Sequence, residues 1–345
     1  MARFMLRVLV VLVSGLLVGC GVQPAPTPTV EPTEAPPRIA LVVGVGGLED
    51  DSFNELTYSG VIAFTGRRGL NFDVEEAPAV AEYEATVRQV AENGYDLILT
   101  VSFPMAGPTQ AVAADFPETY FIGIDQNYET GAENLTGIIF PEDHAGYLAG
   151  VLAANMTETN TVGGVFGPEV VLPVARFAEG YEAGVRAVSE DIEILSLFHP
   201  GSVDEGFVDP EWGQQTAAEH IAAGADVIFA AAGDTGNGAL VETANRALDD
   251  ERVFCIGVDT DQWQTVPDAR PCLLTSAVKD IPQAVEDVML QVLDGNPPDG
   301  VYSGPAGLAS FHDFAEVIPE ELQAELAQIA ADLTSGELEI GGEGA

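Results

Sequence analysis

Residues 38–45 read RIALVVGV, and residues 52–67 read SFNELTYSGVIAFTGR. The first stretch is apolar and rich in β-branched residues, which is typical of a buried strand. The second spaces its apolar residues with a helical period, and Ser52 stands where an N-cap residue is expected. A strand followed directly by a helix is the unit from which parallel sheets are built.

The same alternation continues along the chain. Further strands are expected at residues 96–101, 120–124, 135–140, 162–166, 192–197, 226–231, 253–258 and 273–278, and helices at 80–93, 105–115, 142–155, 174–188, 210–223, 236–248 and 280–294. This number of strands is too large for one doubly wound sheet. We therefore predict an α/β fold with two doubly wound lobes. Ligands of such sheets bind beyond the carboxyl ends of the strands.

Composition restricts the class of partner. The 345 residues include 55 Asp and Glu against 12 Lys and Arg, a formal charge of −43, and 47% of them are hydrophobic. The apolar share is sufficient for a packed core. The charge excludes a nucleic-acid binder, because phosphate contacts need clustered cations, and it disfavours polyanionic substrates. A salty habitat and a demand for solubility both remain open.

The N-terminus is typical of an export signal. Arg3 and Arg7 precede the apolar residues 8–18, and the run ends at Gly19 and Cys20. This pattern resembles a bacterial lipobox, so we expect a signal peptide at 1–19, lipidation at Cys20 and a location on the cell membrane, facing the extracytoplasmic side. An ordinary signal peptide with an incidental Cys is the alternative. The Pro-rich remainder of residues 20–37 indicates a linker, and no later segment is apolar for long enough to span a membrane.

Only two other cysteines exist, Cys255 and Cys272, at the starts of two apolar runs. They can form a disulfide outside the cytoplasm or remain two buried thiols, and the sequence does not decide between these. No Cys or His spacing indicates zinc, so we expect no metal and no cofactor.

Two glycine-rich stretches follow predicted strands. Residues 44–54, GVGGLEDDSFN, begin like a dinucleotide-binding fingerprint, but Glu49 and two further acids stand where a pyrophosphate needs bare N–H groups. Residues 233–238, GDTGNG, lack the Lys of a P-loop and suit close approach of the backbone to a neutral ligand. Each stretch can equally be a tight turn.

Charged residues also follow two strands. Asp259 and Asp261 can accept hydrogen bonds from vicinal hydroxyls or remain solvated turn acids. Lys279, the only lysine of the chain, can neutralise acids around a cleft, donate to a ligand or simply begin a helix. No catalytic motif for nucleophilic or metal-assisted hydrolysis is present, so we do not expect an enzyme.

Several segments together resemble the basic membrane protein family of bacterial lipoproteins, which are solute-binding components of ABC importers. The matching segments lie at residues 46–54, 142–150, 162–184, 233–238, 257–262 and 275–279, in the order of the family. The resemblance implies a type I periplasmic-binding-protein fold with a three-strand hinge. We expect one lobe at 38–141 plus about 260–305, a second at 142–259 plus about 306–335, and a flexible acidic tail at 336–345.

The resemblance also implies the ligand site. A nucleoside base, with purine favoured, would stack between Phe53 and Phe207. The other expected ligand-binding residues are Asp50, Asn54, Phe103, Asp125, Phe177, Gly233, Gly236, Asp259 and Lys279. Purine-binding members usually carry an Asp where this chain has Gly44, so the identity of the base is open. ABC permease subunits are the expected partners. The alternatives are a receptor for a sugar or an autoinducer-like furanose, a sensory module and a nucleoside hydrolase.

Overall fold

The first strand and helix lie where the sequence places them. In the computed structural model, which describes residues 35–128, 132–249 and 251–341, β1 (Ile39–Val43) is buried throughout and α1 (Phe53–Arg68) follows it. Ser52 is the N-cap residue of α1, but its hydroxyl caps nothing. Instead, the Asp50 carboxylate accepts the backbone N–H groups of Ser52, Asn54 and Glu55. The predicted cap position is therefore right, while the capping side chain is two residues earlier.

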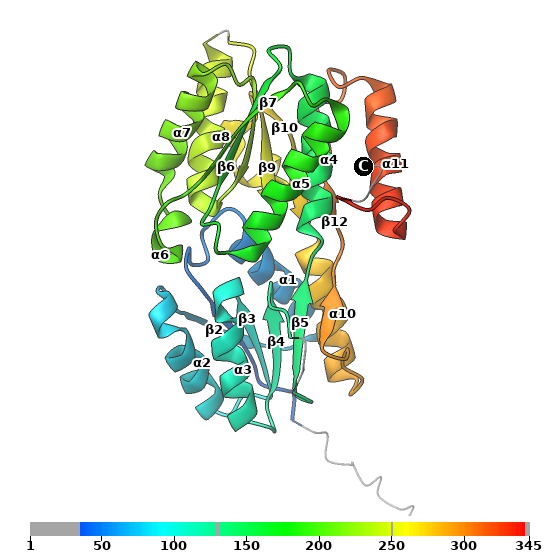
Figure 1. The fold of residues 1–345 in the computed structure, drawn as a ribbon. Helices are drawn as coiled ribbons and strands as arrows, with labels where there is room; N and C mark the ends of the chain where they lie inside the picture. Colours follow the sequence, from blue (N-terminus) through cyan, green and yellow to red (C-terminus); the bar gives the residue numbers. More distant parts are fainter. Residues whose placement is uncertain (1–34, 129–131, 250, 342–345) are drawn as a thin grey trace, which may run out of the picture. The chain divides into compact units, whose positions relative to one another are not determined.

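Two six-stranded sheets organise the residues from Pro37 onward (Figure 1). The first sheet is parallel and has the order β11-β5-β4-β3-β1-β2. Its other strands are β2 (Phe72–Glu76), β3 (Leu97–Val101), β4 (Tyr120–Ile124), β5 (Leu135–Ile139) and β11 (Val301–Ser303). The side chains of α1 and α10 (Ile281–Leu293) share one core with this sheet, and those of α2 (Tyr83–Glu92) and α3 (Ala106–Asp115) share another. The short helices η1 (Val80–Glu82) and η2 (Phe103–Met105) lie beside them.

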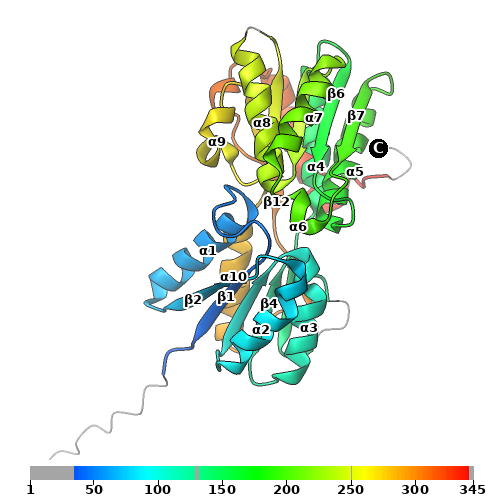
Figure 2. The ribbon, with the colours of Figure 1, turned by 90° about the vertical axis from the view of Figure 1, so that its left-hand side faces the viewer.

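The second sheet has the order β12-β10-β9-β8-β6-β7 and is parallel except for the pair of β10 and β12. Its strands are β6 (Thr161–Phe166), β7 (Glu193–Phe198), β8 (Val227–Ala231), β9 (Phe254–Asp259), β10 (Leu273–Lys279) and β12 (Ala306–Leu308). One core joins it to α4 (Glu142–Met156), α5 (Leu172–Val188) and α11 (Glu320–Ser335), and another to α7 (Pro210–Ala222) and α8 (Gly233–Leu248). Figure 2 shows α7 and α8 side by side next to this sheet. The short elements are α6 (Val203–Gly206), α9 (Gln262–Thr265), η3 (Pro267–Ala269) and η4 (His312–Phe314).

The chain passes between the two sheets three times, after β5, after β10 and between β11 and β12. The expected lobe boundary near residue 260 is wrong, because β10 pairs in parallel with β9 and so belongs to the second sheet. The crossing lies at Asp280 instead. The first lobe therefore takes residues 39–139 and 281–303, and the second takes 142–279 and 306–335.

Some expectations concern the ends of the chain. The signal peptide, Cys20 and most of the linker lie outside the described residues. At the other end, residues 336–341 depart from the expected flexible tail, because Leu338 and Ile340 pack against the core of the second lobe. Residues 342–345 lie outside the described part. No helix among the described residues has the length and apolarity needed to cross a membrane.

Two close contacts hold the second lobe together. Cys255 and Cys272 form a disulfide between the starts of β9 and β10, which decides the alternative that the sequence left open. Helices α4 and α5 pack so closely that a Cβ at Gly180 would overlap the backbone of Asp143, and one at Gly184 that of Tyr147. The glycines of these helices therefore serve helix packing.

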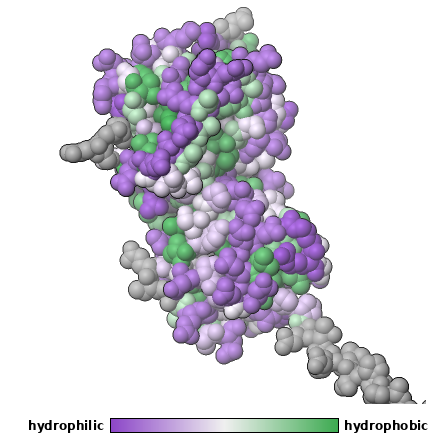
Figure 3. Space-filling model, turned by 90° about the vertical axis from the view of Figure 1, so that its right-hand side faces the viewer, coloured by the Kyte–Doolittle hydropathy of each residue, from purple (hydrophilic) through white to green (hydrophobic). Residues whose placement is uncertain are grey.

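The surface and the interior differ in polarity, as the composition predicts. The face drawn in Figure 3 is mainly hydrophilic, with scattered apolar residues. Large aromatic side chains such as Tyr83, Tyr181 and Phe229 are fully buried.

Candidate functional site

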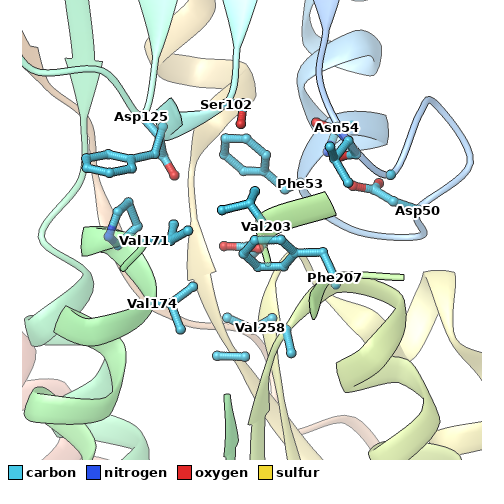
Figure 4. Close-up of a pocket in the computed structure, with 18 of the residues that line it drawn as sticks. Asp50, Phe53, Asn54, Ser102, Asp125, Val171, Val174, Val203, Phe207 and Val258 are labelled. Carbon is cyan, nitrogen blue, oxygen red and sulfur yellow. The ribbon is translucent and has the colours of Figure 1, made fainter. Parts of the chain in front are cut away.

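A cavity lies between the two lobes, at the carboxyl ends of the strands, as expected for parallel sheets (Figure 4). The space within it that the centre of a water molecule can occupy has a volume of about 90 Å³. This is room for several waters at roughly 10–15 Å³ each. The lining residues are Val45, Gly46, Asp50, Phe53, Asn54, Ser102, Phe103, Pro104, Asp125, Val171, Pro173, Val174, Phe177, Val203, Phe207, Ala231, Ala232, Gly233, Val258, Asp259 and Lys279.

The aromatic residues expected from the sequence meet in this cavity. Phe53 comes from the first turn of α1 and Phe207 from the residue after α6, and both rings project into the same space (Figure 4). Phe103 and Phe177 also line it. Each lobe therefore supplies apolar ring surface to a site that polar side chains border.

Lys279 is buried among three carboxylates. Its Nζ lies 2.6 Å from Asp125 Oδ2, 3.1 Å from Glu142 Oε1 and 3.8 Å from Asp259 Oδ1. The sequence left open whether this lysine neutralises acids or donates to a ligand, and the geometry supports neutralisation. Asp125 comes from the first lobe and Asp259 from the second, so the ammonium joins the two.

Burial and charge oppose each other in this cluster. Burial alone would lower the pKa of Lys279, but the fields of Asp125, Glu142 and Asp259 raise it above its ordinary value. Burial raises the pKa of Asp125 and of Glu142, although Lys279 opposes this. Burial also raises the pKa of Asp259 to about 6. One cation therefore faces three acids, and the cluster holds protons more readily than exposed carboxylates do.

Glu142 was not expected in the site. It is the first residue of α4, only 2% exposed, and its Oε2 lies 3.7 Å from an Arg176 nitrogen. The charge balance of the sequence could have indicated Glu142. A single buried lysine near the crossings between the lobes needs carboxylate counterions close to it. Glu142 stands directly after the crossing that follows β5.

Asp50 and Asn54 shape the turn between β1 and α1. Besides capping α1, Asp50 lines the cavity, and burial raises its pKa to about 6 although three backbone N–H groups oppose the shift. Asn54 donates from Nδ2 to the Val45 carbonyl at 3.0 Å. Both residues therefore hold the cavity wall as well as facing the space within it.

The two glycines expected in the site differ. Gly233 lines the cavity with φ +57°, and a Cβ there would lie 3.2 Å from the Phe207 carbonyl oxygen, so the close approach needs glycine. Gly236 lies within the first turn of α8 and is not among the lining residues, so we remove it from the predicted site.

Gly44 has a structural reason for lacking a side chain. A Cβ there would lie 2.6 Å from the Tyr83 hydroxyl oxygen. That hydroxyl accepts the N–H of Val45 at 3.0 Å. The wall beside Val45 therefore has a buried tyrosine in place of a carboxylate.

Hydrogen bonds join the lobes around the cavity. Asn237 donates to the Asp50 carbonyl at 3.3 Å. Thr265 donates to the carbonyl of Asp51 at 2.7 Å. The N–H of Val80 donates to Asp204 Oδ1 at 2.8 Å. These contacts make the structure a closed arrangement of the two lobes.

Comparisons with known proteins agree with this geometry. Residues 38–301 match the family described as ABC transporter substrate-binding protein PnrA-like. The "CD4+ T-cell-stimulating antigen" of Listeria monocytogenes is 29% identical over 320 residues, covering 88% of this chain and 87% of that protein. The "ABC transporter nucleoside-binding protein BmpA" of Lactococcus lactis is 28% identical, covering 76% and 77%. A solved ABC transporter solute-binding protein of Aeropyrum pernix K1 superposes with a TM-score of 0.77 at 24% identity, covering 88% and 93%, which shows the shared fold.

Proposed function

Because the chain belongs to the family of PnrA-like ABC transporter substrate-binding proteins, we propose that it binds a nucleoside, with purine favoured, in the cavity between its lobes. The family is one of transport components, so the chain serves uptake of a solute. The observation that carries the proposal is the pair Phe53 and Phe207, which reach one cavity from different lobes. A flat heteroaromatic ring between two such faces gains about 1–3 kcal/mol for each stacked face.

The polar groups of the cavity suit the sugar of a nucleoside. Asp125 and Asp259 offer carboxylate oxygens, and Asp125 Oδ1 is buried with no hydrogen-bond partner among the described residues. Buried acceptors without partners are costly, so a ligand with vicinal hydroxyls would satisfy them. The relative from Lactococcus lactis is named as nucleoside-binding, which agrees with this ligand class.

Charge restricts the ligand to molecules without phosphate. The only lysine of the chain is already held by three carboxylates, and three acids line the cavity. A nucleoside monophosphate would place its charge beside these acids, and Lys279 is the only cation among the described residues that line the cavity. The site therefore favours the nucleoside over its phosphate.

Mechanism follows from the three crossings between lobes. Rotation of the lobes about these crossings exposes the cavity. A ligand held by both lobes favours the closed form, and an ABC permease would bind the surface of that form. Lipidation at Cys20 would hold the protein at the extracytoplasmic face of the membrane. Radiolabelled palmitate incorporated by the wild-type chain but not by Cys20→Ala would support the anchor, whereas equal incorporation would contradict it.

Isothermal titration of the purified protein tests the ligand. We expect adenosine, guanosine or inosine to bind, adenosine monophosphate to bind at least tenfold more weakly, and free ribose not to compete. If all three nucleosides fail while a pentose binds, the site is that of a sugar receptor, and the nucleoside proposal is wrong. Release of free base during the incubation would instead indicate a hydrolase.

A further inference from the structure

The loop of residues 199–209 carries Phe207 into the cavity. It leaves the end of β7, forms α6 and enters α7 at its N-cap residue Asp209. The Phe207 ring covers Gly167, where a Cβ would come within 2.6 Å of the ring. No helix or strand contains Phe207 itself, so its direction depends on how this loop is held.

His199 is the first residue of the loop, and its ring contacts residues near both ends of the loop. The residue is 8% exposed, and its Nδ1 accepts the N–H of Gly201 at 3.0 Å. Its Nε2 lies 3.4 Å from Asp209 Oδ2. A ring nitrogen that accepts a hydrogen bond carries no proton, so the proton of the neutral ring lies on Nε2 and faces Asp209.

The partners of the ring are themselves fixed. Asp209 Oδ1 accepts the N–H of Trp212 and so caps α7, while its own N–H donates to Thr235 Oγ1 at 2.9 Å. The Trp212 ring meets the imidazole edge-to-face at 4.6 Å between centroids. The imidazole therefore connects Gly201 in the loop to Asp209, which caps α7 and bonds to Thr235 of α8.

The His199 ring also lies next to Gly206, the residue that precedes Phe207. A Cβ at Gly206 would lie 3.1 Å from His199 Nδ1, so the imidazole and this peptide are in close contact. We propose that His199 is a positioning residue for Phe207, whose imidazole braces the 199–209 loop and so fixes the aromatic face that the ligand meets. The inference rests on the proposed binding function and adds a residue that does not line the cavity.

A double-mutant cycle tests the inference. We would titrate adenosine, guanosine and inosine into the wild type, His199→Ala, Phe207→Ala and the double variant. His199→Ala should weaken binding about two- to tenfold, the effect of one lost hydrogen bond. In the Phe207→Ala background the same change should have almost no effect, because the group that it positions is gone.

Two further variants separate positioning from general stability. His199→Asn keeps an acceptor near the place of Nδ1 and should recover most of the affinity. His220→Ala is the matched control, since His220 lies in the same lobe and its ring approaches the Gly164 carbonyl at 3.3 Å, away from the loop. It should leave affinity unchanged. Equal losses for His199→Ala with and without Phe207, or no recovery by Asn, would overturn the inference.

Hydrogen exchange distinguishes failure of this inference from failure of the proposed function. If none of the three nucleosides binds the wild type, the proposed function fails. Amide exchange at residues 201–207 then still tests the brace. Faster exchange in His199→Ala than in His220→Ala supports it, and equal exchange contradicts it.

Discussion

Phe53 is half-buried at the start of α1, with its ring in the cavity. Truncation removes a stacking face while leaving the helix and its Asp50 cap in place. Phe53→Ala should therefore weaken nucleoside binding by about 1–3 kcal/mol, measured by calorimetry, with thermal unfolding little changed. Phe72→Ala is the control, because Phe72 lies on β2 against Tyr58 and is not among the cavity residues. Unchanged affinity in Phe53→Ala would contradict the stacking account.

Asp259 should make binding depend on pH. Burial raises its pKa to about 6, while a ligand hydroxyl that donates to it favours the ionised form. Binding then releases a proton, so affinity should fall as the pH falls through about 6. Calorimetry at pH 7.5 and pH 5 measures this, and Asp259→Asn should flatten the profile. A profile that is flat in the wild type would contradict the expected contact.

The stability of the ligand-free protein should change with pH in the direction opposite to the ligand affinity. Asp50 and Asp259 have pKa values raised from 3.8 to about 6 on folding. The folded state therefore binds more protons than the unfolded state in this window, and the stabilisation is present below 3.8 and lost as the pH rises through about 6. These two groups should therefore make the free energy of unfolding, measured in urea, larger at pH 5 than at pH 7. The double variant with Asn at both positions should show a smaller difference between the two pH values.

Lys279 should contribute strongly to stability. Lys279→Met leaves three buried carboxylates without the lysine that pairs with them, so we expect a loss of about 3–5 kcal/mol in unfolding free energy, measured by urea unfolding. Arg67→Met, which removes an exposed pair with Glu286, should cost less than about 1 kcal/mol. Similar melting temperatures for the two variants would contradict the role assigned to the cluster.

The residues that the sequence could indicate are those directly after strands. Asp125, Asp259 and Lys279 follow predicted apolar runs, and parallel strands bring their carboxyl ends to one edge. Glu142 and His199 also stand within two residues of expected strands, but their position did not identify them, because their roles depend on partners far away in the sequence or across a loop. Valines such as Val174 line the cavity but are indistinguishable from core residues by type.

At the scale of elements, the disulfide between β9 and β10 should affect folding without affecting the site. It joins residues 17 apart at the amino ends of these strands, whereas the cavity lies at their carboxyl ends. Replacing both cysteines by Ala should lower the unfolding free energy by about 3 kcal/mol, the value for a loop of similar length. Nucleoside affinity should stay unchanged. A comparable loss of affinity would mean that the strand ends are coupled to the site.

Most of the elements that the sequence analysis missed are short, polar or at sheet edges, and the exception is the 16-residue helix α11. β2 has the sequence FDVEE and buries none of its residues fully, so it lacks the apolar run that identifies its neighbours. β11 and β12 have three residues each. The lobe boundary near 260 was wrong because a parallel pairing such as that of β10 with β9 leaves no local mark in the sequence.

At the scale of the whole molecule, charge repulsion should make stability depend on salt. With a formal charge of −43, acidic side chains repel one another across the surface. Raising NaCl from about 0.05 to about 1 M shortens the screening length to roughly 3 Å, so the melting temperature should rise. The buried pairs of Lys279 are screened far less. A melting temperature that falls with salt would show that exposed ion pairs outweigh the repulsion.

A crystal structure of the protein grown with the nucleoside that binds most tightly tests the central claim most directly. We predict density for a heteroaromatic ring between Phe53 and Phe207, with ribose oxygens within hydrogen-bond distance of Asp125 or Asp259. Density for the nucleoside elsewhere, or a Phe53 ring turned away into the packed interior, would contradict the account.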